Sequence, residues 1–175
     1  MTKKPFPKKI LVSSILLLAA AGAGWYFFVY SRSDEAQIRS VLETLCSIGS
    51  KSQGEGAASS VRKLKALEKV SAEEVDFDLD NSIFSGRLKL SEFSGNVVRF
   101  RALFREVRIT MRDLEVTVES PDSAKALFTG SLDGVGKTER GIGRVSEVRD
   151  IFCRLRKIDG VWKVVSLDIE RVLQK

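Results

Sequence analysis

The feature that most constrains the fold is the C-terminal segment, residues 148–172, where two apolar-rich runs flank Asp159 and Gly160. An Asp-Gly pair between such runs is a strong signal for a two-residue hairpin turn, because that turn needs positive φ at both central positions. The sequence therefore predicts two long antiparallel strands, residues 148–158 and 161–172.

A two-residue turn also sets the register of the hairpin. The expected cross-strand pairs are Ile158 with Val161, Leu155 with Val164, Cys153 with Ser166, and Ile151 with Asp168. One face then carries Ile151, Cys153, Leu155, Trp162, Val164, Ser166 and Asp168, and the other carries Phe152, Val165, Leu167 and Ile169. Because both faces are rich in apolar side chains, we expect both to be covered.

Residues 10–30 form an uncharged stretch of 21 residues. A helix of that length crosses about 30 Å of hydrocarbon. Lysines lie on its N-terminal side, and the positive-inside tendency places that side in the cytoplasm. The sequence thus predicts a basic cytoplasmic tail (1–9), a transmembrane anchor (10–30) and an exported domain (31–175).

These segments indicate a single-pass protein of the cell inner membrane, with its domain in the periplasm or outside the cell. A cleaved signal peptide is the alternative, because the small residues at positions 19–23 offer cleavage sites. The apolar run continues past those sites to Tyr30, which favours the anchor.

Charge and residue content exclude several functions. The net charge of +6 includes four lysines before residue 31, and the remainder carries 25 basic and 23 acidic residues. A nearly neutral domain is a poor partner for nucleic acid. The chain has no histidine and only two cysteines, so we expect no metal site and no cofactor.

The rest of the exported part alternates between helical and strand patterns. Apolar spacing predicts helices at 34–48, 61–70 and 91–107, and strands at 75–79, 108–119 and 124–132. A phase change after Met111 predicts a bulge. Residues 134–143 are polar and glycine-rich and are expected to form a connection.

Four arginines recur at helical spacing through the third predicted helix. They are Arg101, Arg105, Arg108 and Arg112. Two interpretations stay open: a stripe for anionic lipid or an acidic partner, and an ordinary solvated helix face.

The element order, together with the segment from Ile158 to Val164 (IDGVWKV), resembles the nuclear transport factor 2-like family, also called SnoaL-like. The resemblance covers about residues 33–173. It implies an α+β fold in which a bent antiparallel sheet wraps three helices as a cone with a pocket at its open end. It also implies a homodimer through the outer sheet face as one form of assembly.

The resemblance and the register together nominate pocket residues. These candidates are Cys153, Trp162, Ser166 and Asp168. Enzymes of the family use pocket Tyr, Asp or His, whereas this chain has no histidine and no tyrosine after Tyr30. Asp168 is the remaining acid that could act as a base, and a rim acid paired with arginine is the alternative.

Two cysteines lie beyond the predicted anchor, Cys46 on the first helix and Cys153 on the hairpin. In an oxidising compartment they are candidates for a helix-to-sheet disulfide. The alternative is two separate buried thiols.

These observations favour a membrane-anchored, extracytoplasmic binding domain without enzymatic activity, whose partner is a small apolar ligand or an envelope protein. A structural subunit, similar in layout to the inner-membrane assembly subunits of type IV secretion systems, is the first alternative. An isomerase- or dehydratase-like enzyme that uses Asp168 is the second.

Overall fold

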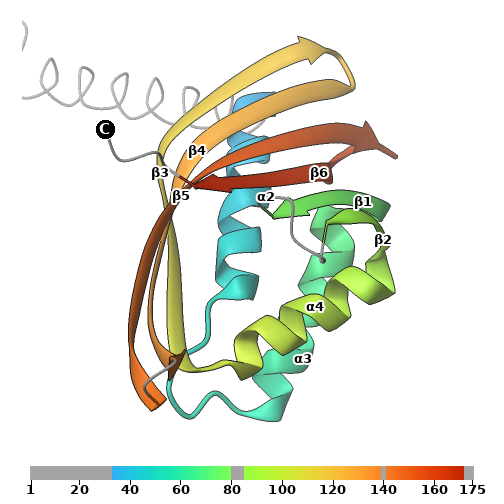
Figure 1. Ribbon diagram of the computed structural model, residues 1–175. Helices are drawn as coiled ribbons and strands as arrows, with labels where there is room; N and C mark the ends of the chain where they lie inside the picture. Colours follow the sequence, from blue (N-terminus) through green and yellow to red (C-terminus); the bar gives the residue numbers. More distant parts are fainter. Residues whose placement is uncertain (1–32, 80–84, 139–140, 172–175) are drawn as a thin grey trace, which may run out of the picture. The chain divides into compact units, whose positions relative to one another are not determined.

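A computed structural model describes residues 33–79, 85–138 and 141–171 (Figure 1). The chain divides into two compact units, residues 1–37 and 38–175, and the fold below is that of the second unit together with residues 33–37, where its first helix begins. The predicted anchor, residues 10–30, lies outside the described residues. Among the helices that are described, none combines the length and apolar character needed to span a membrane.

The unit contains helices and one sheet. The helices are α2 (Asp34–Gly49), α3 (Ala57–Val70) and α4 (Leu90–Ala102). The strands are β1 (Ser71–Leu79), β2 (Gly86–Lys89), β3 (Phe104–Ser120), β4 (Ser123–Thr138), β5 (Gly141–Ile158) and β6 (Val161–Arg171).

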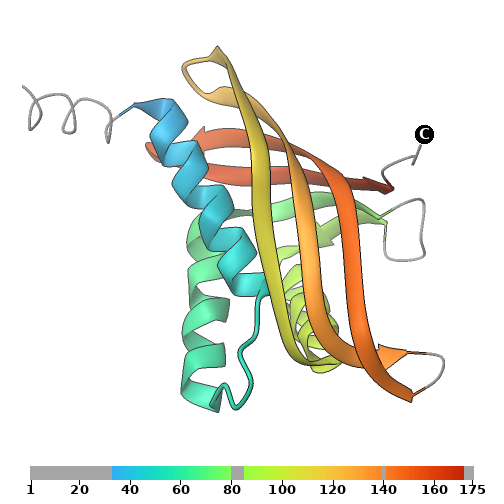
Figure 2. The same cartoon turned by 90° about the vertical axis from the view of Figure 1, so that its left-hand side faces the viewer.

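The sheet has the strand order β2-β1-β6-β5-β4-β3. Neighbouring strands are antiparallel except for β1 and β6, which run parallel with Phe77 opposite Leu167. The predicted α+β fold with helices on one side of a bent sheet is confirmed (Figures 1 and 2). The prediction of a purely antiparallel sheet is wrong. The last strand, β6, lies beside the first strand, β1, and the two run parallel.

Helix α2 forms as predicted. The Ser33 hydroxyl accepts a hydrogen bond from the Ala36 amide at 3.2 Å, and Asp34 and Glu35 occupy the first turn, where the helix dipole favours acids. The buried residues of this helix are Ile38, Val41, Leu42 and Ile48. Their spacing places them on one face, which packs into the core.

The third predicted helix is too long. Helix α4 ends at Ala102, and Phe104 already pairs with Gly136 across the β3–β4 ladder. Pairing with β4 satisfies the backbone N–H and C=O groups that a longer helix would otherwise have paired. As residues of β3, Phe104 and Val107 are buried in the core. The helical arginine stripe therefore does not exist, because only its first member, Arg101, lies on the helix.

The glycine-rich segment expected to be a connection is largely strand. A Cβ atom at Gly134 would lie 2.7 Å from the Glu106 carbonyl oxygen, and one at Gly136 would lie 2.7 Å from Cδ1 of Phe104. These glycines let β3 and the Phe104 ring approach β4 closely, so here glycine marks close packing rather than a loop.

The predicted bulge in β3 is confirmed. The β3–β4 ladder passes from Arg112 opposite Thr129 to Glu115 opposite Leu127, so β3 holds one extra residue. Asp113 within this bulge has a φ of 51°. Such an insertion bends the strand and increases its local twist.

The core lies between the helices and the inner face of the sheet. Its largest side chains with less than 2% exposure are Trp162, Ile38, Leu42, Ile48, Leu67 and Leu155. Burying an aliphatic side chain of this size contributes about 1.5–3 kcal/mol. These residues occupy the space between the helices and the inner face of the sheet.

The hairpin turn is also confirmed, and it yields a stability prediction. Asp159 and Gly160 have φ values of 52° and 78°, as a type I′ turn requires. Replacing Gly160 with alanine should lower the free energy of unfolding by about 1 kcal/mol, because a Cβ disfavours this conformation.

Gly95 provides the matched control. It lies within α4, and a Cβ atom there would meet nothing within 4 Å. Gly95→Ala should therefore raise the free energy of unfolding by about 0.5–1 kcal/mol. Urea denaturation of both variants measures the two effects, and shifts of the same sign would contradict the assignment.

Candidate functional site

The register of the β5–β6 hairpin decides where the predicted site residues lie. It follows the prediction from the turn to Leu155, which pairs with Val164. Beyond this point Arg154 pairs with Ser166, so that β6 carries Val165 as an extra residue. Because of this bulge, every later residue of β6 lies on the opposite face of the sheet from the one predicted.

The bulge separates the four pocket candidates. Cys153 pairs with Leu167 rather than with Ser166, and Phe152 rather than Ile151 pairs with Asp168. Cys153 and Trp162 are each 1% exposed and belong to the core. Ser166 and Asp168 lie on the opposite face of the sheet, which points away from the helices.

The predicted division of the hairpin's apolar residues between the two faces is therefore wrong for Leu167 and Ile169. Leu167 is buried and Ile169 packs against the core, because the bulge turns both inward. Their place on the outer face is taken by Ser166 and Asp168. The outer face keeps Phe152, with 44% of its surface exposed.

A groove of about 530 Å³ lies on the outer face of the sheet, across β3, β4, β5 and β6. It is lined by Glu115, Thr117, Lys125, Ala126, Leu127, Phe152, Cys153, Arg154, Ser166, Asp168 and Glu170. Ser166 and Asp168 are thus brought together with Phe152 at a surface groove. The groove combines one exposed aromatic ring with charges of both signs.

The polar contacts in this groove are weak and solvated. Arg154 Nη2 donates to Ser166 Oγ at 3.4 Å, and at the rim Lys125 Nζ lies 2.6 Å from Glu119 Oε1. Exposed ion pairs of this kind contribute at most about 1 kcal/mol. The groove is therefore an open surface feature that combines polar, charged and aromatic side chains.

Sequence reasoning missed a buried ion cluster around Glu55. The Glu55 side chain is 5% exposed, and it accepts hydrogen bonds from Lys63 Nζ at 2.8 Å, from Ser60 Oγ at 3.1 Å and from the Arg101 guanidinium. Burial disfavours its ionisation, but these donors outweigh burial and lower the pKa of Glu55 to about 2.

The cluster ties α3 and α4 to the segment that precedes α3. Nearby, Lys51 Nζ donates to the carbonyl oxygens of Arg101 (3.2 Å) and Phe104 (2.7 Å). Glu55 and Arg101 are 46 residues apart in the chain, and the polar segment around Glu55 looks like a flexible break. No local spacing in the sequence could have revealed this pair.

Both cysteines are present as thiols. Burial, followed by the nearby Glu43 charge, raises the pKa of Cys46 to about 11. Burial, followed by the charge on Cys46, raises the pKa of Cys153 to about 12. Within residues 33–79, 85–138 and 141–171, no group of three or more His, Cys, Asp or Glu side chains is arranged to hold a metal ion.

The Glu55 cluster predicts acid sensitivity. The pKa of Glu55 is lower in the folded chain than the ordinary value of 4.5. The stability that the ionised carboxylate contributes is therefore fully present above pH 4.5 and is lost as the pH falls towards 2. The Glu55→Gln variant should lack this part of the pH dependence. Denaturant titrations of both proteins between these pH values measure it, and identical slopes would contradict the assignment.

The cysteines predict low thiol reactivity. Because a thiolate is the reactive form, raised pKa values should make both thiols slow towards a thiol reagent at pH 7.5 in the native chain, with Cys46 reacting before the buried Cys153. Two thiols should titrate after denaturation without reductant. No titratable thiol under those conditions would instead indicate the disulfide.

No protein-family profile matches the sequence, and no curated protein matches it either. Solved structures do match its fold. The Kfla4162 protein of Kribbella flavida aligns with a TM-score of 0.66 and 13% identity, covering 81% of this chain and 93% of that protein. A proposed dehydratase of the NTF2-like family from Streptomyces avermitilis aligns at 0.61, with 15% identity and coverages of 81% and 98%.

A third structure, an NTF2-like protein with a cystatin-like fold from Novosphingobium aromaticivorans, has a TM-score of 0.59 and 14% identity. The alignment covers 90% of this chain and 92% of that one. Identities this low carry the fold and not the activity. The exported domain predicted from the sequence therefore has the NTF2-like, cystatin-like α+β fold.

Proposed function

We propose that this chain is a membrane-anchored, non-enzymatic binding domain that recognises an envelope protein through the outer face of its sheet. The observation that carries the proposal is the separation of the candidate residues. Trp162 helps to fill the core, whereas Ser166 and Asp168 line a groove on the outer face of the sheet.

The filled core argues against the small apolar ligand. A ligand site needs a concave space lined by apolar side chains. The centre of this unit is instead occupied by Trp162, Leu42 and Leu155, each with at most 1% of its surface exposed. Binding a ligand there would require these side chains to move.

The outer face has the composition of a protein interface. Ile142, Val148 and Phe152 lie on the same side of β5, because the β4–β5 ladder runs without a register shift between them. Their exposed fractions are 58%, 50% and 44%. Exposed apolar residues with charged neighbours are typical of a protein-binding surface.

An enzyme of the dehydratase type receives less support. The proposed dehydratase from Streptomyces avermitilis shares the fold at 15% identity. In this chain Asp168, the acid that such a reaction would use, lies at the outer groove beside the exposed Phe152 and away from the core. A general base in an open, hydrated groove gains little of the desolvation that tunes a catalytic carboxylate.

Site-specific photo-crosslinking of the full chain in its native membrane tests this interface.

 A photoreactive phenylalanine analogue at position 152 or 148 should form one discrete adduct. The same analogue at position 98, an exposed valine on α4, is the matched control and should form none. The mass of the adduct distinguishes a second copy of this chain from a different protein.

A charge substitution completes this test. Phe152→Glu should abolish the adduct formed from position 148, because a carboxylate at the centre of the groove is costly to bury in an interface. Adducts of equal yield from positions 148 and 98, or none from the outer face, would contradict the proposal.

A further inference from the structure

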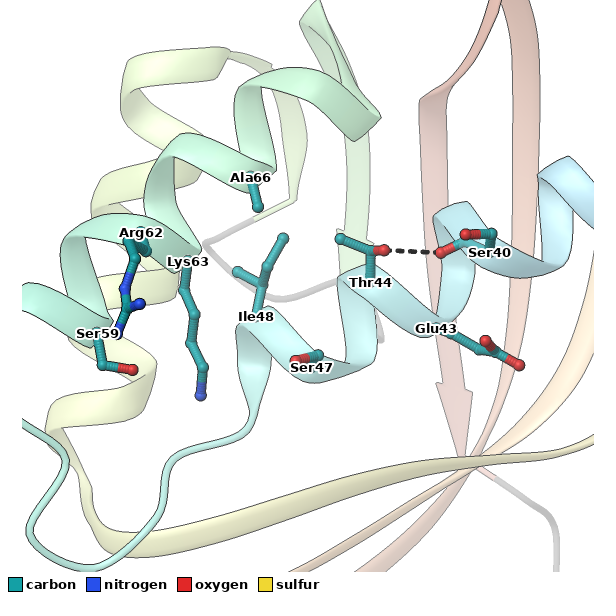
Figure 3. A pocket seen from close by; sticks show the side chains of 9 residues that line it. All are labelled: Ser40, Glu43, Thr44, Ser47, Ile48, Ser59, Arg62, Lys63 and Ala66. Atoms are coloured by element: carbon teal, nitrogen blue, oxygen red, sulfur yellow. Dashed lines mark hydrogen bonds between the residues drawn. The ribbon is translucent and has the colours of Figure 1, made fainter.

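A second groove, of about 380 Å³, lies between α2 and α3 on the helical side of the unit. Figure 3 shows hydroxyl groups from both helices along it, with Lys63 on α3 between Ser47 on α2 and the α3 residues Ser59 and Arg62. Ser40 and Glu43 lie further along α2. The groove therefore has a cationic end and an acidic end.

The cationic end holds unused hydrogen-bond donors. An ammonium group has three N–H donors, and Lys63 uses two of them, one to the Ser50 carbonyl oxygen and one to Glu55, both at 2.8 Å. Arg62 is exposed and has no hydrogen bond or ion pair with any residue that the structure describes. Its planar fork can bind two oxygens of one anion.

The charges behind this end are unbalanced. Glu55 is a single carboxylate, yet it pairs with both Lys63 and Arg101. Arg101 is 5% exposed, and its Nε atom has no hydrogen-bond partner. The first turn of α3 contains no acid, and Gly56 provides no side-chain cap, so the helix dipole adds to the positive potential.

We propose that this groove binds a small oxyanion, a phosphate or a carboxylate, at its cationic end. Arg62 and the free N–H of Lys63 donate to the anion, and the hydroxyls of Ser47 and Ser59 complete its shell. Neither hydroxyl has a hydrogen-bond partner among the described residues. Glu43 at the far end repels the anion, which favours its position at the cationic end.

Calorimetric titration of the full chain in nanodiscs of neutral lipid tests this site, with inorganic phosphate and acetate as separate probes. Arg62→Gln should weaken binding at least about tenfold, because a charge-assisted bidentate contact is lost. Lys65→Gln removes an exposed cation of the same helix that does not line the groove, and it should leave the affinity unchanged.

A second pair of variants places a carboxylate at each end of the groove. Ser47→Asp should abolish binding. Ser40→Asp should have a smaller effect, because seven helical residues span about 10 Å, which is one Debye length at about 0.1 M salt. Thermal unfolding checks that each variant is folded.

The two probes separate the classes of oxyanion. Saturable binding of either probe that Arg62→Gln weakens and Lys65→Gln preserves supports the site, and the tighter probe identifies the class. The absence of saturable binding for both probes, or equal weakening by the two substitutions, would overturn it. None of these variants touches the outer sheet face, so the result is independent of the proposed protein interface.

Discussion

The pairing of β6 with two neighbours is the constraint on which the rest of the structure depends. This strand is antiparallel to β5 on one side and parallel to β1 on the other. It contributes Trp162, Val164 and Leu167 to the core. In a regular strand, residues an odd number of positions apart face opposite sides. The extra residue Val165 lets both Val164 and Leu167 face the core, although they are three positions apart. Without the bulge, Leu167 would face away from the helices.

Much of the fold follows from local patterns in the sequence. The Asp159-Gly160 turn, the apolar spacing of α2 and the β3 bulge near Asp113 all leave local signals, and all three are confirmed. The errors arise where distant packing overrides a local signal. The helical pattern continues past Ala102, but pairing with β4 converts Phe104 into a strand residue, and the glycines at 134 and 136 serve that pairing.

The candidate site was harder to predict, because one inserted residue changes the face of every later position. The alternating pattern of β6 gives no clear sign of the bulge at Val165, since apolar residues occur on both sides of it. The sequence therefore predicts Asp168 and Cys153 on one face, whereas in the structure they lie on opposite faces. The Glu55 cluster left no sequence signal at all, because its partners come from separate elements.

The buried core and the two surface grooves lie in separate parts of the unit. The apolar side chains on the inner face of the sheet hold the helices, and the polar and exposed apolar residues lie where another molecule can reach them. In this arrangement the surface can change without altering the core. This separation is consistent with the low identity of other chains that share the fold.

The parallel pairing of β1 with β6 has a consequence for how the chain is made. Phe77 and Leu167 lie opposite each other although 90 residues separate them in the chain. A contact of this separation forms only after most of the polypeptide has emerged, and topologies of this kind fold slowly. Until the last strand arrives, the inner faces of β1 and β5 lack the partner that joins them. Until β6 has been made, the unit would therefore remain open and dependent on protection from aggregation.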